Sequence, residues 1–374
     1  DGFALVNDPS IDVVVELIGG YGIAKDLIMA AISNGKHVVT ANKALLAVHG
    51  DEIFAAARAH GVIVAFEAAV AGGIPIIKAL REGLTANRIQ WIAGIINGTT
   101  NFILSEMRDK GISFAAALED AQRMGYAEAD PTFDIEGVDA AHKITILSAL
   151  AFGIPMQFSR AHIEGISKLE ADDIRYAEQL GYRIKLLGIA KWRAGGVELR
   201  VHPTLIPARR LIANVEGAMN AILVQADAVG STMYYGKGAG AEPTAPAVIA
   251  DLVDVARLHK ASPEHRVPSL AFQPDAVKDT SVMPIAEIDS GYYLRLRVED
   301  KRGVLADITR ILADQQISID AMIQREPDEG ESQTDIIMLT HVTKERFVDI
   351  AISKIEALPV VTQRVVRLRM EDLG

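Results

Sequence analysis

The chain has 374 residues, more than one ordinary hydrophobic core can organise, and this length predicts two or three domains. Its net charge of -11 argues against a nucleic-acid partner, which clustered Lys and Arg would bind, and its lack of cysteine excludes disulfides and thiolate-held zinc within this sequence. No apolar run reaches the roughly 20 residues that a membrane-spanning helix needs. We therefore expect a cytoplasmic protein without a nucleic-acid or membrane partner.

The first part of the sequence predicts alternating strands and helices. Hydrophobic strands are expected over residues 11–18, 36–40 and 62–66, separated by helices over 24–34 and 41–60. Strands that are hydrophobic along their whole length are typical of a parallel sheet covered on both faces. Their alternation with helices predicts a doubly wound α/β fold.

The middle of the sequence predicts further strands and helices, joined by one polar turn. A strand over 89–96 leads into Asn97-Gly98-Thr99-Thr100-Asn101, where the helical period that follows favours a strand-to-helix turn over a hairpin. Ser113 is expected to cap a helix that ends near Gly125. Residues 215–229 fit a strand or a helix equally well.

An acidic segment, residues 128–143, ends in Lys143 within a helix predicted over 138–152. Helical steps of three, four and seven from Lys143 reach only isoleucine and leucine, so its face points into a core, and Asp139 lies one turn back. In isolation the two residues fit a surface ion pair worth only about 0.3 to 0.5 kcal/mol. The apolar remainder of the helix favours a buried amine beside a carboxylate, an arrangement suited to proton transfer.

A stretch with several prolines, residues 261–290, predicts a linker before a C-terminal module. After it the expected elements follow the order βαββαβ, with a loop that contains Asp328, Glu329 and Gly330. The strands are expected over residues 292–298, 318–325, 334–342 and 360–370, and the helices over 303–315 and 344–357.

Four motifs occur in one order along the chain: Val39-Thr40-Ala41-Asn42-Lys43, Ile96 to Asn101, the acidic segment, and Gly238-Ala239-Gly240. Together they resemble homoserine dehydrogenase, over residues 11–258. The C-terminal module resembles an ACT domain, marked by Asp300-Lys301-Arg302-Gly303-Val304-Leu305. The resemblance implies reversible, NAD(P)-linked interconversion of aspartate 4-semialdehyde and homoserine.

The resemblance also implies three domains. Residues 1–66 and about 230–260 are expected to form a partial Rossmann-like nucleotide-binding domain, without its first strand and glycine-rich loop, and so with weakened cofactor binding. Residues 67–229 are expected to form an α+β domain for catalysis and dimerisation. Residues 291–374 are expected to form the ACT domain.

Catalytic roles are implied for Lys143, Asp139 and Lys43. Lys143 is expected to donate and accept the proton, since burial favours its neutral amine while nearby carboxylates favour the ammonium. Asp139 would orient this amine or a bridging water. Lys43, just past the carboxyl end of a parallel strand, would contact cofactor and substrate. Substrate binding is implied for Glu128, Asp134, Asn97, Gly98 and Thr99.

Cofactor, metal and effector sites are implied in the same way. The residues expected to face NADP or NAD are Gly19, Gly20, Thr40, Asn42, Lys43, Gly238, Gly240 and Glu242. The residues expected to hold a sodium ion, largely through main-chain carbonyls, are Glu67, Val70, Gly72 and Ile74. The residues expected to bind an amino-acid effector, threonine, are Asp300, Gly303, Val304 and Leu305.

The motifs and the activity also have other interpretations. Lys43 fits an ordinary first helical turn, Asn97 a helix cap, and residues 236–240 a flexible connector. The chain could be an amino-acid-sensing scaffold without catalysis, which the intact set of acidic and basic residues disfavours, or a related amino-acid semialdehyde dehydrogenase. We expect a homodimer or homotetramer, and the sequence leaves NAD and NADP undecided.

Overall fold

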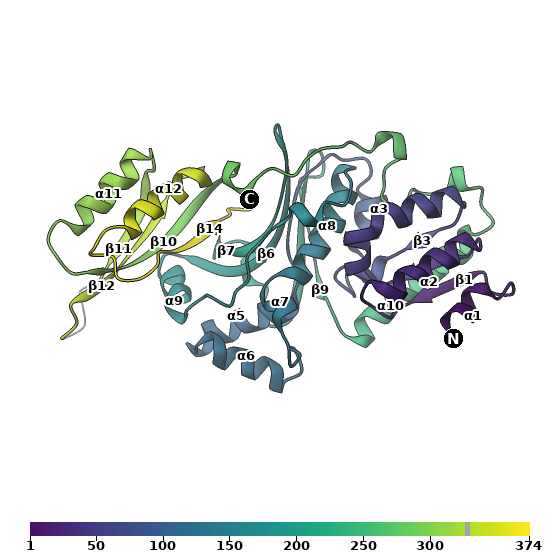
Figure 1. The fold of residues 1–374 in the computed structure, drawn as a ribbon, viewed down its shortest axis with the longest axis horizontal. Helices are drawn as coiled ribbons and strands as arrows, with labels where there is room; N and C mark the ends of the chain where they lie inside the picture. The colour runs from purple at the N-terminus through teal and green to yellow at the C-terminus, as the bar shows by residue number, and fades with distance from the viewer. Residues whose placement is uncertain (326–329) are drawn as a thin grey trace.

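The computed structural model describes residues 1–325 and 330–374. Figure 1 shows three parts in a row: an N-terminal α/β part, a central sheet with its helices, and a C-terminal α/β part. The strands of the central and C-terminal parts belong to one eleven-stranded sheet, whereas the N-terminal part has a separate three-stranded sheet. Among the described residues, no helix has the length and apolar character needed to cross a membrane.

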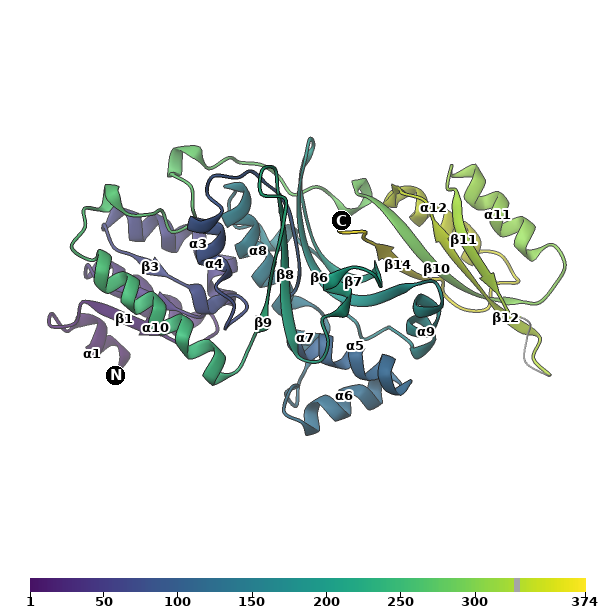
Figure 2. The ribbon, with the colours of Figure 1, turned by 180° about the vertical axis from the view of Figure 1, so that it is seen from behind.

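The N-terminal sheet is parallel and is covered by helices on both faces (Figure 2). Its elements are α1 (Gly2–Asn7), β1 (Val13–Glu16), α2 (Gly22–Ser33), β2 (His37–Thr40), α3 (Lys43–Ala59), β3 (Val64–Ala65) and the returning helix α10 (Ala241–Leu258). Val38 of β2 lies in the cluster with α2 and α3, whereas Val39 packs with Ala247 and Val248 of α10. Because successive side chains of a strand point to opposite faces, the predicted doubly wound arrangement is confirmed.

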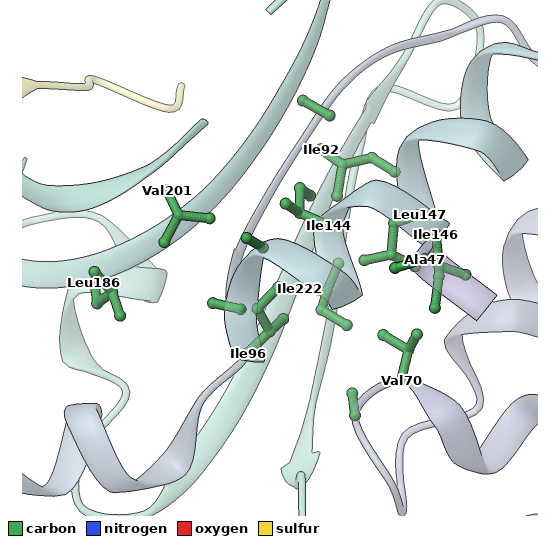
Figure 3. Close-up of a cluster of buried hydrophobic side chains, with 14 of the residues drawn as sticks. Ala47, Val70, Ile92, Ile96, Ile144, Ile146, Leu147, Leu186, Val201 and Ile222 are labelled. Carbon is green, nitrogen blue, oxygen red and sulfur yellow. The ribbon is translucent and has the colours of Figure 1, made fainter. Parts of the chain in front are cut away.

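The central part is an antiparallel sheet in the order β7-β6-β4-β8-β9. Its elements are β4 (Ile89–Ile95), α5 (Gly98–Lys110), α6 (Phe114–Arg123), α7 (Thr132–Ile135), α8 (Val138–Phe152), β5 (His162–Ile163), α9 (Ala171–Gln179), β6 (Tyr182–Arg193), β7 (Gly196–Pro207), β8 (Met219–Ala226) and β9 (Ser231–Lys237). Figure 3 shows Ile144 and Leu147 of α8 among side chains of the sheet and of the N-terminal part, such as Ile92, Ile222 and Ala47. Helix α8 therefore lies in the core between the two sheets.

The structure answers the open question about residues 215–229, because β8 lies within them and no helix does. The helix predicted over 138–152 is confirmed as α8. The long hairpin of β6 and β7 was not predicted, because buried polar residues such as Lys185, Arg200 and His202 interrupt its apolar pattern. These residues are tolerated in the core because hydrogen bonds satisfy them.

The C-terminal part has the βαββαβ order that the sequence predicts. Its elements are β10 (Asp289–Glu299), α11 (Val304–Asp314), β11 (Ile319–Gln324), β12 (Gln333–Thr340), β13 (Thr343–Lys344), α12 (Glu345–Glu356) and β14 (Val366–Met370). The strands lie in the order β11-β12-β10-β14, with α11 and α12 against one face. The short β13 was not predicted, and β14 begins later than the strand expected over 360–370. The predicted loop residues Asp328 and Glu329 lie outside the described residues.

An ion-pair cluster joins the C-terminal part to the central sheet, where β14 pairs in parallel with β7. The buried guanidinium of Arg369 on β14 donates to Glu345 Oε2 of α12 at 2.7 Å and to Glu164 Oε2, just after β5, at 2.8 Å. Because breaking a buried ion pair leaves an uncompensated charge, the arginine holds the two parts in one relative orientation.

Candidate active site

A cluster of charged side chains lies where the N-terminal end of α8 meets α3 and the β4–α5 turn. Gly137, with φ of 82° in the left-handed region, precedes α8 and turns the chain so that Asp139 falls in the first helical turn. Lys143, one turn later, has only 10% of its side chain exposed. Its Nζ donates to Asp139 Oδ2 at 2.6 Å and to the carbonyl oxygen of Ile96 at 2.8 Å. The pair is buried, as the apolar helix predicts, and is not a surface ion pair.

Asp139 is the residue on which the cluster converges. Its Oδ2 also accepts a hydrogen bond from Asn97 Nδ2 at 2.9 Å, and its Oδ1 lies 3.2 Å from Lys43 Nζ. Burial acts to raise the pKa of Asp139, but the ammonium groups of Lys143 and Lys43 lower this pKa to about 2. The ionised carboxylate lies between two lysines, so the three groups together carry one excess positive charge.

Asn97 connects the cluster to the acidic segment. Its Oδ1 caps α5 by accepting from the main-chain N–H of Thr100 at 2.9 Å, and its Nδ2 donates to Asp134 Oδ1 at 2.7 Å. Burial raises the pKa of Asp134, as does the nearby Asp139 carboxylate. Asn97 therefore caps the helix and also donates to two acidic side chains, while its role in substrate binding stays a prediction.

The β1–α2 turn, expected to face the cofactor, is held by a network of polar side chains. Gly19 and Gly20 have φ of 81° and 71°, values that favour glycine, and both are exposed. Asn42 Nδ2 donates to the carbonyl oxygen of Gly20 at 2.8 Å, and the Asn42 main-chain N–H donates to Thr40 Oγ1 at 3.0 Å. Thr40 and Asn42 thus support the turn and are themselves buried.

Glu16 completes this network and was missed in the sequence. Its Oε2 accepts from Thr40 Oγ1 at 2.8 Å, and its Oε1 accepts from the main-chain N–H of Ile18 at 2.7 Å. The side chain is 3% exposed, although it ends a strand that otherwise contains only valine. That single carboxylate at the end of an apolar strand is the signal that could have identified it.

The glycine-rich return loop packs tightly against the predicted cation loop. A Cβ placed on Gly238 would lie 1.8 Å from Asn220 Nδ2, and a Cβ on Gly72 would lie 2.7 Å from the carbonyl oxygen of Gly238. The main-chain N–H of Gly73 donates to the carbonyl oxygen of Lys237 at 3.1 Å. Gly240 and Glu242 follow, at the start of α10, and are exposed. The segment is therefore a packed crossing and not a free connector.

Three predicted substrate residues, Glu128, Thr99 and Gly98, make no contact with the charged cluster in the part of the chain that the structure describes. Glu128 is exposed, and within the described chain no ion pair or side-chain hydrogen bond links its carboxylate to Asp139 or Lys143. The hydroxyl of Thr99 donates to the carbonyl oxygen of Tyr126 at 2.6 Å. Gly98 approaches the main chain so closely that a Cβ would lie 2.7 Å from the Ala218 carbonyl oxygen. The structure thus gives Thr99 and Gly98 packing contacts.

His142 lies beside the cluster and was not singled out in the sequence. Its ring is fully buried and stacks on Phe158 at a centroid distance of 4.2 Å, while Nε2 lies 3.5 Å from the hydroxyl of Tyr21, just past the glycine turn. Burial lowers the pKa of His142 to about 4. Neutral His142 therefore connects the α8 helix with the β1–α2 turn, and its only sequence signal is its position next to Lys143.

Glu67, expected at the sodium site, is a buried carboxylate at the start of a helical segment. Its Oε1 and Oε2 accept from the main-chain N–H groups of Ile77 and Lys78 at 2.9 and 2.8 Å. Burial raises the pKa of Glu67 to about 7, against the lowering effect of these two hydrogen bonds. The carbonyl oxygen of Ile74 accepts from the N–H of Ile76 at 2.8 Å, which leaves it one lone pair.

The predicted effector residues lie at the turn between β10 and α11. Gly303 precedes α11 with φ of 94°, and a Cβ on it would meet no atom within 4 Å. The main-chain N–H of Asp300 donates to the carbonyl oxygen of Ser332 at 2.9 Å. Val304 is buried and Leu305 is half-buried. The turn therefore opens to solvent on its glycine side.

A doubly wound parallel sheet with an open glycine turn at its carboxyl edge, and beside it a buried lysine–aspartate pair, together define a dinucleotide-dependent oxidoreductase. Comparison with known families makes the assignment specific. Residues 1–67 match the NAD-binding domain of homoserine dehydrogenase, 75–253 match homoserine dehydrogenase, and 292–360 match the ACT domain. The chain belongs to the homoserine dehydrogenase family.

Similar proteins cover the whole chain. A curated homoserine dehydrogenase from Pseudomonas aeruginosa is 61% identical over 374 residues, which are 100% of this chain and 86% of that protein. The crystal structure of a homoserine dehydrogenase from Thiobacillus denitrificans superposes with a TM-score of 0.96 at 70% identity, covering 100% of this chain and 85% of that one. A hyperthermophilic archaeal homoserine dehydrogenase in complex with NADPH gives a TM-score of 0.61 at 28% identity, covering 70% and 76%. This chain is an NAD(P)-dependent oxidoreductase with an ACT domain.

Proposed function

We propose that the chain reduces aspartate 4-semialdehyde to homoserine, reversibly, with Lys143 as the residue that exchanges the proton. The observation that carries this assignment is the buried contact of 2.6 Å between Lys143 Nζ and Asp139 Oδ2. In the reducing direction a bound nicotinamide cofactor would supply a hydride to the aldehyde carbon. The Lys143 ammonium gives its proton to the alkoxide oxygen and is left as a neutral amine, and in the reverse direction this amine takes the proton back.

The charge balance of the cluster supports this role. The Asp139 carboxylate lies between the Lys143 and Lys43 side chains, so positive charge would adjoin an alkoxide that develops next to Lys143. In a poorly solvated site such a charge stabilises the transition state more than it does in water. Lys43 is the more open of the two lysines, with 33% of its side chain exposed, and is suited to polarise the aldehyde oxygen.

The β1–α2 turn fits a dinucleotide cofactor. A Cβ on Gly19 or Gly20 would meet no atom within 4 Å, so the main chain there is open to a ligand, and α2 begins immediately after it. Gly238, Gly240 and Glu242 of the return loop are proposed to contact the cofactor as well. The archaeal relative solved with NADPH supports a nicotinamide dinucleotide here, and kcat/KM measured with NADPH and with NADH would decide between the two.

Asp134 and Glu128 are proposed to hold the ammonium group of the amino-acid substrate. Asp134 is half-buried, and among the described residues only its Oδ1 accepts a hydrogen bond, from Asn97. Glu128 is exposed at the start of the acidic segment and would have to turn toward the site when substrate binds. Two carboxylates would thus orient one cation, so that a single substrate geometry reacts.

We also propose that a sodium ion binds at Glu67, Val70, Gly72 and Ile74. Both carboxylate oxygens of Glu67 already accept main-chain hydrogen bonds. The main-chain carbonyls of Val70, Gly72 and Ile74 are therefore better suited than this carboxylate to bind the ion. Oxygen ligands of this kind suit a hard cation. Comparing the thermal unfolding midpoint in sodium chloride with that in choline chloride at equal ionic strength tests the site.

The ACT domain is proposed to bind threonine as a feedback effector, in a homodimer or homotetramer. The match over residues 292–360 supports amino-acid regulation. The cysteine-free sequence suits a reducing compartment such as the cytoplasm. Turnover measured with increasing threonine, on the full chain and on a chain ending before residue 290, tests the effector, and light scattering tests the assembly.

The decisive experiment for the activity follows NADPH oxidation with aspartate semialdehyde. Wild type should turn over and Lys143→Ala should lose most of kcat. Near-normal kcat in Lys143→Ala, with the variant still folded, would contradict the assignment of Lys143.

A further inference from the structure

A short segment after β5, residues 164–166, lies between the central sheet and the turn that joins α7 to α8. The main-chain N–H of Glu164 donates to the carbonyl oxygen of Val201 at 2.8 Å, which continues the pairing of β5 with β7. The main-chain N–H of Ile166 donates to the carbonyl oxygen of Ile135, the last residue of α7, at 2.8 Å. Ile166 is fully buried. The segment therefore has main-chain contacts with β7 on one side and with α7 on the other.

Gly165 packs against the α7–α8 turn so closely that no side chain fits at its position. A Cβ on Gly165 would lie 2.3 Å from the carbonyl oxygen of Ile135 and 2.5 Å from the Cα of Glu136. A Cβ on Gly137 would lie 3.4 Å from the carbonyl oxygen of Glu164. Because a close-packed interior transmits displacement, a shift of this segment must move the turn as well.

The α7–α8 turn carries both acidic residues of the candidate site. The carbonyl oxygen of Asp134 in α7 accepts from the main-chain N–H of Gly137 at 3.0 Å. The carbonyl oxygen of Gly137 accepts from the N–H of Ala141 at 3.0 Å, in the first turn of α8, which contains Asp139. Asn97 donates to both carboxylates. The position of the turn therefore sets where these two carboxylates lie relative to Asn97.

The side chain of Glu164 is held by the ACT domain. Arg369 Nη1 of β14 donates to Glu164 Oε2 at 2.8 Å, and Arg369 Nη2 donates to Glu164 Oε1 at 3.0 Å. His162 Nε2 lies 2.8 Å from Glu164 Oε1. Burial acts to raise the pKa of Glu164, but its hydrogen bonds with His162 and Arg369 hold this pKa well below its ordinary value. The carboxylate is therefore ionised at neutral pH, and the bond of both its oxygens to one guanidinium fixes its orientation.

We infer that Glu164 is a positioning residue for the substrate site. Arg369 fixes its carboxylate, and residues 164–166 then fix the α7–α8 turn. Glu164 acts through this turn on Asp134 and Asp139, and not by contact with the substrate. The inference rests on the proposed role of Asp134 in holding the substrate ammonium group. It makes the geometry of the site depend on how the ACT domain is docked.

The first test is steady-state kinetics of full-length Glu164→Gln with aspartate semialdehyde and NADPH. We expect KM for aspartate semialdehyde to rise by about 5- to 150-fold, the range typical of coupling between two sites. KM for NADPH should stay unchanged, because Asn42 holds the glycine turn through a separate contact. Glu164→Asp keeps the charge and should recover part of the loss. Glu119→Gln, which changes an exposed carboxylate of α6, is the matched control and should behave as wild type.

Hydrogen exchange measures the same linkage without relying on turnover. In Glu164→Gln the amides of residues 132–137 should exchange faster with deuterium than in wild type, whereas those of α6 should not change. Gly165→Ala should speed the same amides, since its Cβ would overlap the Ile135 carbonyl oxygen. Gly195→Ala is its control, because the nearest atom to a Cβ there lies at 3.9 Å.

The outcomes separate this inference from the proposed activity. Unchanged exchange over residues 132–137 in folded Glu164→Gln would overturn the linkage. A lower kcat and a lower unfolding midpoint, with KM for aspartate semialdehyde unchanged, would indicate structural damage alone and overturn the positioning role. If wild type does not turn over aspartate semialdehyde, the proposed function fails, while the exchange measurement still decides whether Glu164 positions the turn.

Discussion

Lys43 Nζ lies 3.2 Å from Asp139 Oδ1, and this contact joins the first turn of α3 in the nucleotide-binding part to helix α8, which carries the proposed proton donor Lys143. Lys43 follows Asn42, which holds the glycine turn through Gly20. Two neighbouring residues, Asn42 and Lys43, thus link the glycine turn to the carboxylate that accepts a hydrogen bond from Lys143. A change on either side of this contact is therefore expected to alter both cofactor use and proton transfer.

Lys143→Ala is expected to lower kcat by about 10²- to 10⁴-fold, the range typical of losing a general acid. The matched control is Lys354→Ala, an exposed lysine of α12 far along the chain from the cluster. Steady-state kinetics with aspartate semialdehyde measure both. Equal losses in the two variants would indicate general damage and contradict the specific role of Lys143.

Asn97→Ala is expected to reduce both stability and activity. It removes the side-chain cap of α5, which should lower the free energy of unfolding by about 0.5 to 2 kcal/mol. It also removes the amide group that donates hydrogen bonds to both Asp134 and Asp139. The value of kcat should therefore fall further than in a variant that loses only a helix cap. Ser113→Ala, which removes the cap of α6 only, is the control. Chemical denaturation and kinetics on both variants separate the two effects.

Gly238→Ala is expected to be destabilising by about 1 to 3 kcal/mol, because its Cβ would overlap Asn220 at 1.8 Å. Cofactor affinity should fall as well, since the return loop must shift. Gly83→Ala is the control, because a Cβ there meets no atom within 4 Å. Thermal unfolding and a titration with NADPH measure the two quantities. If Gly238→Ala unfolds at the same temperature as wild type and binds NADPH with the same affinity, the close packing of the return loop contributes to neither property.

Arg369→Met is expected to lower the free energy of unfolding by about 3 to 5 kcal/mol, since Glu345 and Glu164 would lose a buried partner. Arg310→Met, on an exposed face, should change little. Limited proteolysis of the linker before β10 should be faster in Arg369→Met, because the ACT domain would be held less firmly. Unchanged proteolysis would contradict the role of this arginine in joining the two parts.

His142 predicts a pH dependence of stability that one substitution can isolate. Its pKa is lowered to about 4 by burial, against an ordinary value of 6.5, so the unfolded chain binds the proton more readily. The stability that neutral His142 contributes is complete above pH 6.5 and is lost as pH falls from 6.5 toward 4. His142→Phe should therefore show a flatter decline than wild type in this window.

The test compares the free energy of unfolding of wild type with that of His142→Phe at each pH. Buried His202 also has a pKa well below 6.5, but it contributes equally in both proteins, so the difference reports on His142. Asp139 acts in a separate window, since its pKa of about 2 places its loss below pH 3.8. Identical curves for wild type and His142→Phe between pH 6.5 and 4 would rule out the buried neutral histidine.

The hydrophobic period and the local residue types of the sequence were enough to predict most of the secondary-structure elements and their order. The alternation of apolar strands and helices predicted the doubly wound sheet, and the six elements of the ACT domain were predicted in order. The apolar face of α8 predicted that Lys143 would be buried. These features depend on residues within one or two turns of each other, and side-chain period reports such local relationships directly.

Tertiary structure alone decided how distant segments meet. Residues 43, 97 and 139 are far apart in the chain, and only packing of α3, α5 and α8 brings Lys43 and Asn97 onto Asp139. The β6–β7 hairpin could not be predicted from the sequence, because Lys185 and Arg200 interrupt its apolar pattern. The partners that allow their burial, such as Asn101 and Glu371, lie elsewhere in the chain. A sequence pattern records which side chains prefer burial, but the partner that makes burial of a charge possible is fixed only when the chain has folded.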